Sequence, residues 1–82
     1  MQNTQDYSVG DYIDDAKVTA AVKGKFLSEK GLDSLDISVE TTDGAVTLTG
    51  NMDSSAQINL AEQVARKVSG VKKVYNKLNV KS

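Results

Sequence analysis

Cysteine and histidine are both absent from this chain of 82 residues. Without cysteine, disulfide bonds, thiolate metal sites and cysteine nucleophiles are excluded. Without histidine, the chain lacks the commonest general base and the commonest transition-metal ligand of proteins. The two absences argue against an enzyme, and we expect neither a bound metal nor a cofactor.

Long apolar runs are missing as well. The chain has no stretch of about 18 apolar residues, so no membrane-spanning helix is expected. Residues 1–8 are polar and lack the apolar centre of a signal peptide. A cytoplasmic protein fits these observations, and so does a mature periplasmic protein whose signal peptide has been removed.

The charges balance in number but are separated along the chain. Eleven acidic and ten basic residues give a formal net charge of −1. Proteins that bind duplex nucleic acid usually carry a large positive excess, so nucleic acid is not an expected partner. From residue 66 onward every charged residue is basic: Arg66, Lys67, Lys72, Lys73, Lys77 and Lys81. Such a run is most often a solvated surface or a complement to a helix end.

The first part of the chain predicts a helix. Its apolar residues at helical spacing are Val18, Ala21, Val22, Phe26 and Leu27. This spacing predicts a helix from about Asp14 to Lys30, with a capping aspartate at its start. Gly31 suits the left-handed position that ends a helix. Residues 1–12 are polar and without periodicity, and we expect them to form a flexible tail to a single domain over residues 13–82.

A β-hairpin is predicted next, because the apolar period changes from 3.6 to 2. The turn is Asp43-Gly44, and a two-residue type I′ turn needs positive φ at both positions. Such a loop pairs Ile37 with Gly50, and this register puts the apolar side chains of both strands on one face. A glycine opposite Ile37 suggests that another element, expected to be a helix, comes close there.

The second half of the chain predicts a helix and a third strand. Asp53 or Ser54 is expected to begin the helix, Ser54 and Gln57 fit a reciprocal capping box, and Gly70 is expected to stop the helix. The inward positions of the third strand are Val74, Asn76, Leu78 and Val80. An unpaired buried amide costs about 1–3 kcal/mol. We therefore expect Asn76 to bond backbone groups of a loop or helix end, rather than to bind a ligand.

These elements give an α+β domain of order α-β-β-α-β. Two helices pack on one face of a three-stranded mixed β-sheet, and the other face is left to solvent. The positions expected to be structural are Asp43, Gly44, Gly50, Gly70 and Asn76.

The outward side of the third strand is the candidate lipid-binding surface. Its residues are Lys72, Lys73, Tyr75, Lys77 and Lys81. Cations beside an aromatic ring can meet phosphate groups, and each contributes about 1 kcal/mol near an anionic membrane. Single-stranded nucleic acid generally requires several aromatic stacking platforms, whereas this strand offers one.

The run from residue 15 to residue 81 resembles a BON domain, the module of osmotically inducible and nodulation-related bacterial proteins. The motifs that carry the resemblance are Asp15-x-x-Val18-x-x-x-Val22, Ile37-Ser38-Val39-Glu40-Thr41-x-Asp43-Gly44-x-Val46-x-Leu48-x-Gly50, Ala61-x-x-x-Ala65 and Gly70-Val71-x-x-Val74-x-Asn76-x-Leu78-x-Val80. The resemblance implies the α-β-β-α-β fold and a binding role at phospholipid membranes in the periplasm. It supplies no catalytic residues.

We therefore expect a non-catalytic, periplasmic module that binds anionic phospholipid in envelope maintenance or osmotic stress protection, with a monomer favoured. The alternative is a protein-interaction or self-assembly module with envelope proteins as partners, because the two edges of a sheet can recruit strands. A cytoplasmic cation sensor ranks last, since the sequence shows no acidic cage.

Overall fold

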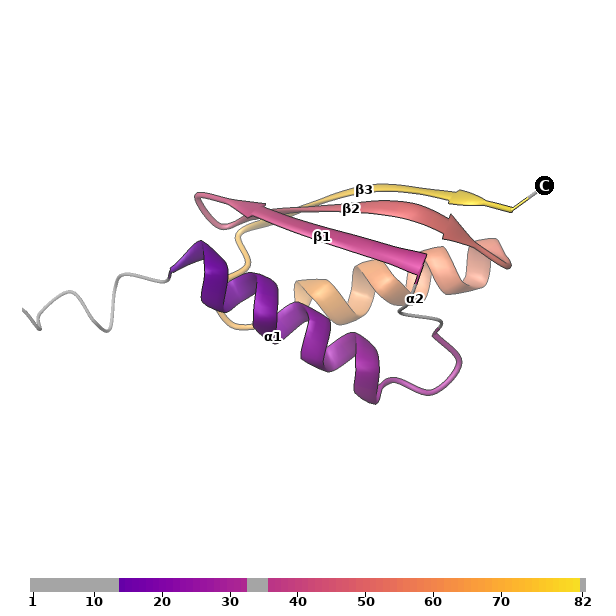
Figure 1. The fold of residues 1–82 in the computed structure, drawn as a ribbon, viewed down its shortest axis with the longest axis horizontal. Helices are drawn as coiled ribbons and strands as arrows, with labels where there is room; N and C mark the ends of the chain where they lie inside the picture. Colours follow the sequence, from indigo (N-terminus) through magenta and orange to yellow (C-terminus); the bar gives the residue numbers. More distant parts are fainter. Residues whose placement is uncertain (1–13, 33–35, 82) are drawn as a thin grey trace, which may run out of the picture.

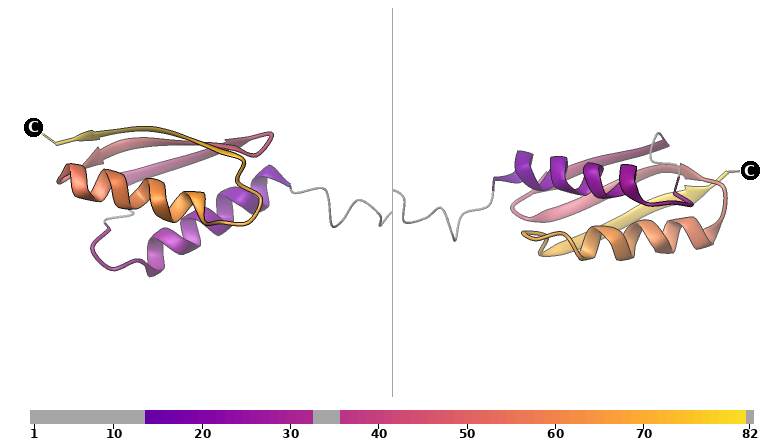
Figure 2. Two further views of the ribbon diagram at one scale, coloured as in Figure 1. Left: turned by 180° about the vertical axis from the view of Figure 1, so that it is seen from behind. Right: turned by 90° about the horizontal axis from the view of Figure 1, so that it is seen from below.

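The structure, a computed structural model, describes residues 14–32 and 36–81. The elements in chain order are α1 (Asp15–Ser28), β1 (Ile37–Thr42), β2 (Ala45–Met52), α2 (Ser55–Arg66) and β3 (Lys73–Val80) (Figure 1). Both helices lie on the same face of the three-stranded sheet, as the two further views in Figure 2 show. The predicted α+β class and element order are confirmed. The predicted tail over residues 1–12 lies outside the described residues.

The sheet is mixed and has the strand order β1-β2-β3. β1 pairs with β2 antiparallel in the predicted register, with Ile37 opposite Gly50. At the turn, φ is 52° at Asp43 and 84° at Gly44, so both residues have the positive φ that a type I′ turn needs. β3 runs parallel to β2, and α2 makes the crossover between them.

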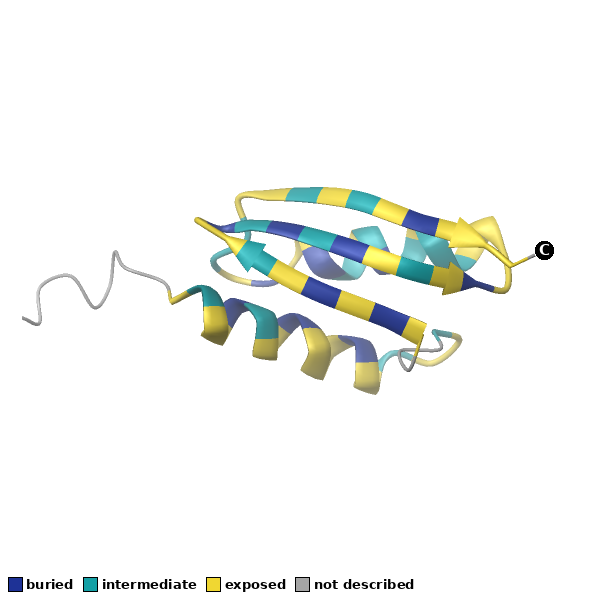
Figure 3. Cartoon of the chain, turned by 45° about the horizontal axis from the view of Figure 1, so that its top comes forward, coloured by how far each residue is buried: buried dark blue, intermediate teal, exposed yellow. Residues whose placement is uncertain are grey.

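The core lies between the sheet and the two helices. Buried and exposed residues alternate along β1, which separates an inner face from a solvent face (Figure 3). The buried residues are Val18, Val22, Phe26, Ile37, Val39, Val46, Leu48, Met52, Ala61, Ala65, Val68 and Leu78. Because Ala61 and Ala65 are small, α2 can approach the sheet closely. One apolar core therefore holds the described elements together, and it leaves the outer face of the sheet open.

α1 ends close to the predicted residue, whereas α2 ends earlier than predicted. α1 stops at Ser28, two residues early, and Gly31 with φ 84° follows its cap. α2 stops at Arg66, four residues before Gly70. Short-range bonds close the last turn of α2, including Val68 N–H to the Ala65 carbonyl at 3.2 Å. Gly70, with φ 95°, instead turns the loop that leads to β3.

Two inward positions also need correction. The close neighbour of Gly50 is the carbonyl group of Asp36 at the entry to β1, and not a helix. A Cβ at Gly50 would overlap the Asp36 oxygen, so the glycine permits a close approach of backbone to backbone. Val80 was expected to face the core but is 49% exposed, because β3 is an edge strand with a sheet neighbour on one side.

The start of α2 follows the predicted cap with one change. The Ser54 hydroxyl accepts a hydrogen bond from Gln57 N–H at 3.3 Å, as a capping box requires. The Gln57 side chain accepts from Asp53 N–H at 3.4 Å, one residue before the expected donor. In the described part of the chain, neither helix has the length and apolar character needed to cross a bilayer.

Candidate functional site

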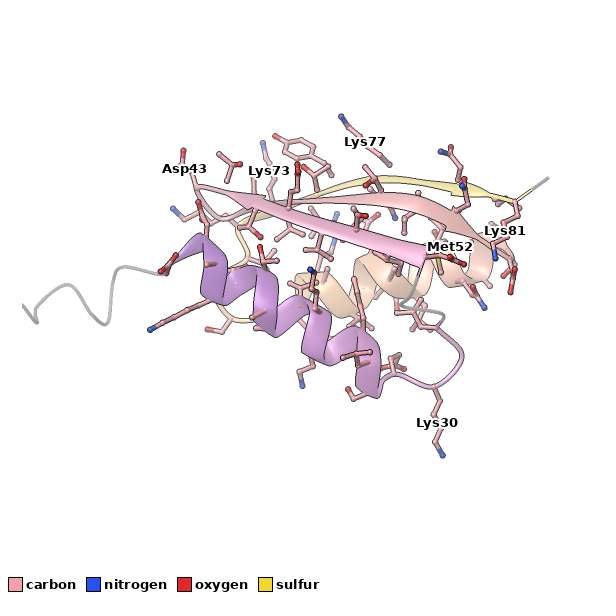
Figure 4. The ribbon with its side chains drawn as sticks, in the orientation of Figure 1. Lys30, Asp43, Met52, Lys73, Lys77 and Lys81 are labelled. Atoms are coloured by element: carbon pink, nitrogen blue, oxygen red, sulfur yellow. The ribbon has the colours of Figure 1, made fainter. Side chains whose placement is uncertain are left out.

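The outer side of β3 carries three of the predicted residues in a line. Lys73, Tyr75 and Lys77 alternate along the strand and are exposed. Figure 4 shows Lys73 and Lys77 on the side of the sheet that faces away from the helices. Lys73 Nζ lies 5.8 Å from the centre of the Tyr75 ring, within the range of a cation–π contact. We call these three residues the basic row.

The neighbours of the basic row are uncharged. In the parallel register Thr47 lies beside Tyr75 and Thr49 beside Lys77. The acidic Glu40 is on β1, beyond Thr47, so one whole strand separates it from the row. Two strand spacings are about 10 Å, where salt already screens exposed charges strongly. The positive charge of the row is therefore not cancelled by the rest of the outer face.

Lys81 lies apart from the basic row, at the opposite end of the sheet from Asp43 (Figure 4). Its ammonium group is 3.0 Å from Asp36 Oδ2 and 3.4 Å from Asp53 Oδ1. The bonds to Asp36 and then to Asp53 raise the pKa of Lys81 above its ordinary value. Since two carboxylates already balance its charge, Lys81 adds little to an anion-binding surface. Lys81 was predicted to be part of the lipid-binding surface, but the structure does not place it with the basic row.

Lys72 lies where the chain enters β3. Its backbone N–H donates to the Gly44 carbonyl at 2.8 Å. A Cβ atom on Gly44 would lie only 2.9 Å from the Cγ and Cδ atoms of the Lys72 side chain. The absence of a side chain at Gly44 therefore makes room for the lysine stem on the hairpin turn. Together with Arg66, Val71, Lys73 and Val74, Lys72 lines a depression of about 230 Å³.

Asn76 joins β3 to α2. Its Nδ2 donates to the Ile58 carbonyl and to Glu62 Oε1, both at 3.1 Å, and its Oδ1 accepts from Leu78 N–H at 3.1 Å. Bonds to backbone groups of a loop or helix end were predicted. The backbone partners are instead Ile58 within α2 and Leu78 on β3 itself, and the bond to the Glu62 side chain was not predicted. The bond from Asn76, followed by that from Arg66, lowers the pKa of Glu62 below its ordinary value. The Asn76 amide thus makes three hydrogen bonds within the fold.

A second exposed surface, on α1, was missed by the sequence reasoning. Leu27 was grouped with the apolar stripe, yet it is 73% exposed and does not enter the core. Lys23, four residues before it, lies on the same side of α1 by helical spacing. Since Val18, Val22 and Phe26 fill the buried face, Leu27 falls on the opposite side. The signal available in the sequence was the i, i+4, i+8 spacing of Val18, Val22 and Phe26, which leaves Leu27 away from the centre of that face.

Two acidic residues at the start of α1 have structural partners. Asp14 caps α1 by accepting from Ala16 N–H at 2.9 Å. Asp15 accepts from the backbone N–H groups of Asp43 and Gly44, at 2.8 Å and 3.1 Å. Within residues 14–32 and 36–81, no three acidic, cysteine or histidine residues gather as metal ligands would. These carboxylates therefore serve the fold, and the basic residues remain as the charges that the site can offer a ligand.

Two helices on one face of a mixed sheet, with a basic row on the open face, define a small α+β domain with a cationic outer strand. The chain belongs to the BON domain family, whose family model matches residues 14–82. The predicted resemblance is confirmed.

Several known proteins are similar to this chain. Osmotically-inducible protein Y of Escherichia coli is 41% identical over 81 residues, which are 99% of this chain and 40% of that protein. The 21 kDa hemolysin of Actinobacillus pleuropneumoniae is 38% identical, over 87% of this chain and 36% of its own length. Outer membrane lipoprotein DolP of Haemophilus influenzae is 40% identical, over 73% of this chain and 31% of its own length. The chain therefore spans less than half of each of these relatives.

Proposed function

We propose that this BON domain is a non-catalytic binding module that associates with anionic phospholipid membranes, in envelope maintenance or osmotic stress protection. The observation that carries the proposal is the basic row, which presents Lys73 and Lys77 on either side of Tyr75 on an open sheet face. Relatives named as osmotically inducible and as an outer membrane lipoprotein support the setting.

The energetics predict weak, salt-dependent association. Each lysine near an anionic surface contributes about 1 kcal/mol, so Lys72, Lys73 and Lys77 together supply about 3 kcal/mol, a factor of roughly 150 in partitioning. A tyrosine ring suits the head-group layer, where its apolar body and polar tip are both accommodated. The attraction between separated charges falls as ionic strength rises.

The test compares two kinds of vesicle. Backbone amide shifts are followed by NMR while vesicles of phosphatidylcholine, or of phosphatidylcholine with phosphatidylglycerol, are added. We expect broadening or shifts of the β3 amides with the anionic vesicles alone. Amide shifts that change with neither kind of vesicle would rule out the proposal.

Matched charge reversals locate the surface. Lys73→Glu with Lys77→Glu should abolish binding if β3 meets the membrane. Lys23→Glu with Lys25→Glu makes the same change in net charge on α1 and serves as the control. Loss of binding in the α1 variant alone would assign the contact to the helix and contradict the role of the basic row.

We propose a periplasmic location, supported by the outer membrane lipoprotein among the relatives. Fractionation of cells that express the natural gene tests this location. The protein should be recovered in the periplasmic fraction, and recovery in the cytosol would refute the proposal.

A protein-interaction or self-assembly role is the second candidate. Its supporting observation is that β3 lies at an edge of the described sheet, where a strand of another protein can add. We favour a monomer, because antiparallel pairing of two β3 strands would bring lysines of both copies together. Sedimentation velocity over a concentration series tests assembly, and recovery of an envelope protein without lipid would support this candidate.

A further inference from the structure

A depression at the corner between α2 and β3 combines charge with an apolar floor. Its lining residues are Arg66, Val71, Lys72, Lys73 and Val74, and its volume is about 230 Å³. Val71 and Val74 are partly buried and pack against the core. The other three residues are cations. We call this feature the corner depression.

Each cation at the corner depression is positioned by a contact of its own. Arg66 bonds Glu62 Oε2 through Nε at 3.0 Å and Nη2 at 2.8 Å. This pair orients the guanidinium group and balances its charge, so Arg66 offers its remaining N–H donors rather than net charge. The stem of Lys72 lies on Gly44, and Lys73 stands over the ring of Tyr75. Side chains that are already held lose less conformational entropy when they bind a ligand.

Lys72 and Lys73 lie too far along the chain to serve as the cations that offset the negative end of the α2 dipole. Cations in the last turn of a helix, such as Arg66, offset the negative end of its dipole. Lys72 and Lys73 come after the helix, on the loop and at the start of β3. The helix dipole therefore does not account for their place beside Arg66 in the lining of the corner depression.

The size of the corner depression limits the ligand. Drug-sized ligands occupy pockets of roughly 300–1,000 Å³, and a water molecule takes up about 30 Å³. A space of about 230 Å³ admits a phosphate group with a few carbon atoms, but not a whole lipid. Planar guanidinium and ammonium groups are the usual partners of phosphate oxygens.

We infer that the corner depression binds one phosphate ester group, with Arg66, Lys72 and Lys73 on its oxygens and the adjoining carbon atoms against Val71 and Val74. This inference rests on the proposed membrane role and deepens it, because it replaces a diffuse attraction between charges with a single saturable site. The phosphate ester can belong to a lipid head group or to a free metabolite.

Three soluble probes and one vesicle distinguish these sources. Glycerol 3-phosphate, inorganic phosphate and monomeric dihexanoyl-phosphatidylglycerol are each titrated into the labelled protein, followed by NMR, and vesicles with phosphatidylglycerol are tested separately. We expect saturable shifts of the amides of residues 71–74, with the lipid monomer binding more tightly than inorganic phosphate because of the two valines. Equal affinity for all three soluble probes would contradict the proposed contact of the ligand's carbon atoms with Val71 and Val74.

Neutral variants of the lysines at and near β3 distinguish the corner depression from the basic row. Lys72→Gln with Lys73→Gln should weaken glycerol 3-phosphate binding roughly 25-fold, at about fivefold for each lysine. Lys77→Gln lies outside the corner depression and should weaken vesicle binding, while affinity for glycerol 3-phosphate stays unchanged.

The failures of the two proposals are distinguishable. An absence of saturable shifts at residues 71–74 would overturn the corner site, and vesicle binding could still hold. An equal loss of glycerol 3-phosphate binding in the Lys77→Gln variant would overturn it too, because the charge would then act diffusely. Saturable binding of glycerol 3-phosphate without vesicle binding would support the site and refute the membrane role.

Discussion

Asp15 Oδ1 accepts a hydrogen bond from the backbone N–H of Gly44 at 3.1 Å, which links the first residue of α1 to the hairpin turn. Its other oxygen accepts from Asp43 N–H at 2.8 Å. Lys72 packs on the same glycine. The turn therefore connects the start of α1, the hairpin and the entry to β3 at one corner of the domain.

Replacing Asp15 should destabilise the fold. Asp15→Ala leaves two turn N–H groups without their acceptor, and hydrogen bonds to charged groups contribute about 1.5–3 kcal/mol. We expect a loss of about 2 kcal/mol in the free energy of unfolding, measured by urea denaturation. Asp14→Ala is the neighbouring control: it removes the helix cap and should cost about 1 kcal/mol. Equal effects of the two changes would mean that the link to the turn adds nothing.

Two glycine substitutions should act in opposite directions. Gly50→Ala forces a side chain into the Asp36 carbonyl at φ 138°, so we expect a loss of about 3 kcal/mol or more. Gly24→Ala, inside α1, meets nothing within 4 Å and should stabilise by about 0.5–1 kcal/mol. Denaturant midpoints check both. A Gly50→Ala protein as stable as the parent would contradict the close approach.

The two asparagines of β3 make a matched pair. Asn76→Ala removes three hydrogen bonds and leaves Leu78 N–H without this acceptor, so we expect a loss of about 2 kcal/mol. Asn79 is exposed on the same strand, and Asn79→Ala should stay within about 0.5 kcal/mol. Thermal unfolding of both variants measures the difference, and similar melting temperatures would show that the Asn76 bonds are not stabilising.

Glu62 should make stability depend on pH in the acid range. Its pKa is lowered in the folded state from an ordinary value of 4.5, so its contribution is present above pH 4.5. The contribution is lost as pH falls through the lowered folded-state value. Glu62→Gln keeps the size of the side chain and removes the charge. The stability difference between the parent and this variant should therefore shrink as pH falls below 4.5, and a constant difference would contradict the assignment.

The local structure was predictable where neighbouring residues decide it. The alternation around Asp43-Gly44 and the need for positive φ at both positions predicted the hairpin and its register. Helix ends were less predictable, because packing and short-range turns compete with a glycine signal. Gly70 shows this: α2 ends before it, and the glycine serves the loop instead.

The candidate site was predictable only in part. Period-two alternation brings Lys73, Tyr75 and Lys77 to one face, so their alignment follows from the sequence. The partners of Lys81 do not, because Asp36 and Asp53 come from separate segments that only the folded chain brings together. A charge run is visible in the sequence, but which of its members are already neutralised depends on tertiary structure.

The mixed pairing of the sheet also constrains how the chain assembles. The β1–β2 hairpin closes a two-residue turn, an event of microseconds, whereas β3 reaches β2 only across the whole of α2. In a partly folded chain the second edge of β2 is therefore open, beside the uncovered side chains of Val46 and Leu48. Such an edge is a template for strands of other molecules. Misassembly between copies would thus begin at the edge of β2, which is paired on both sides in the finished domain.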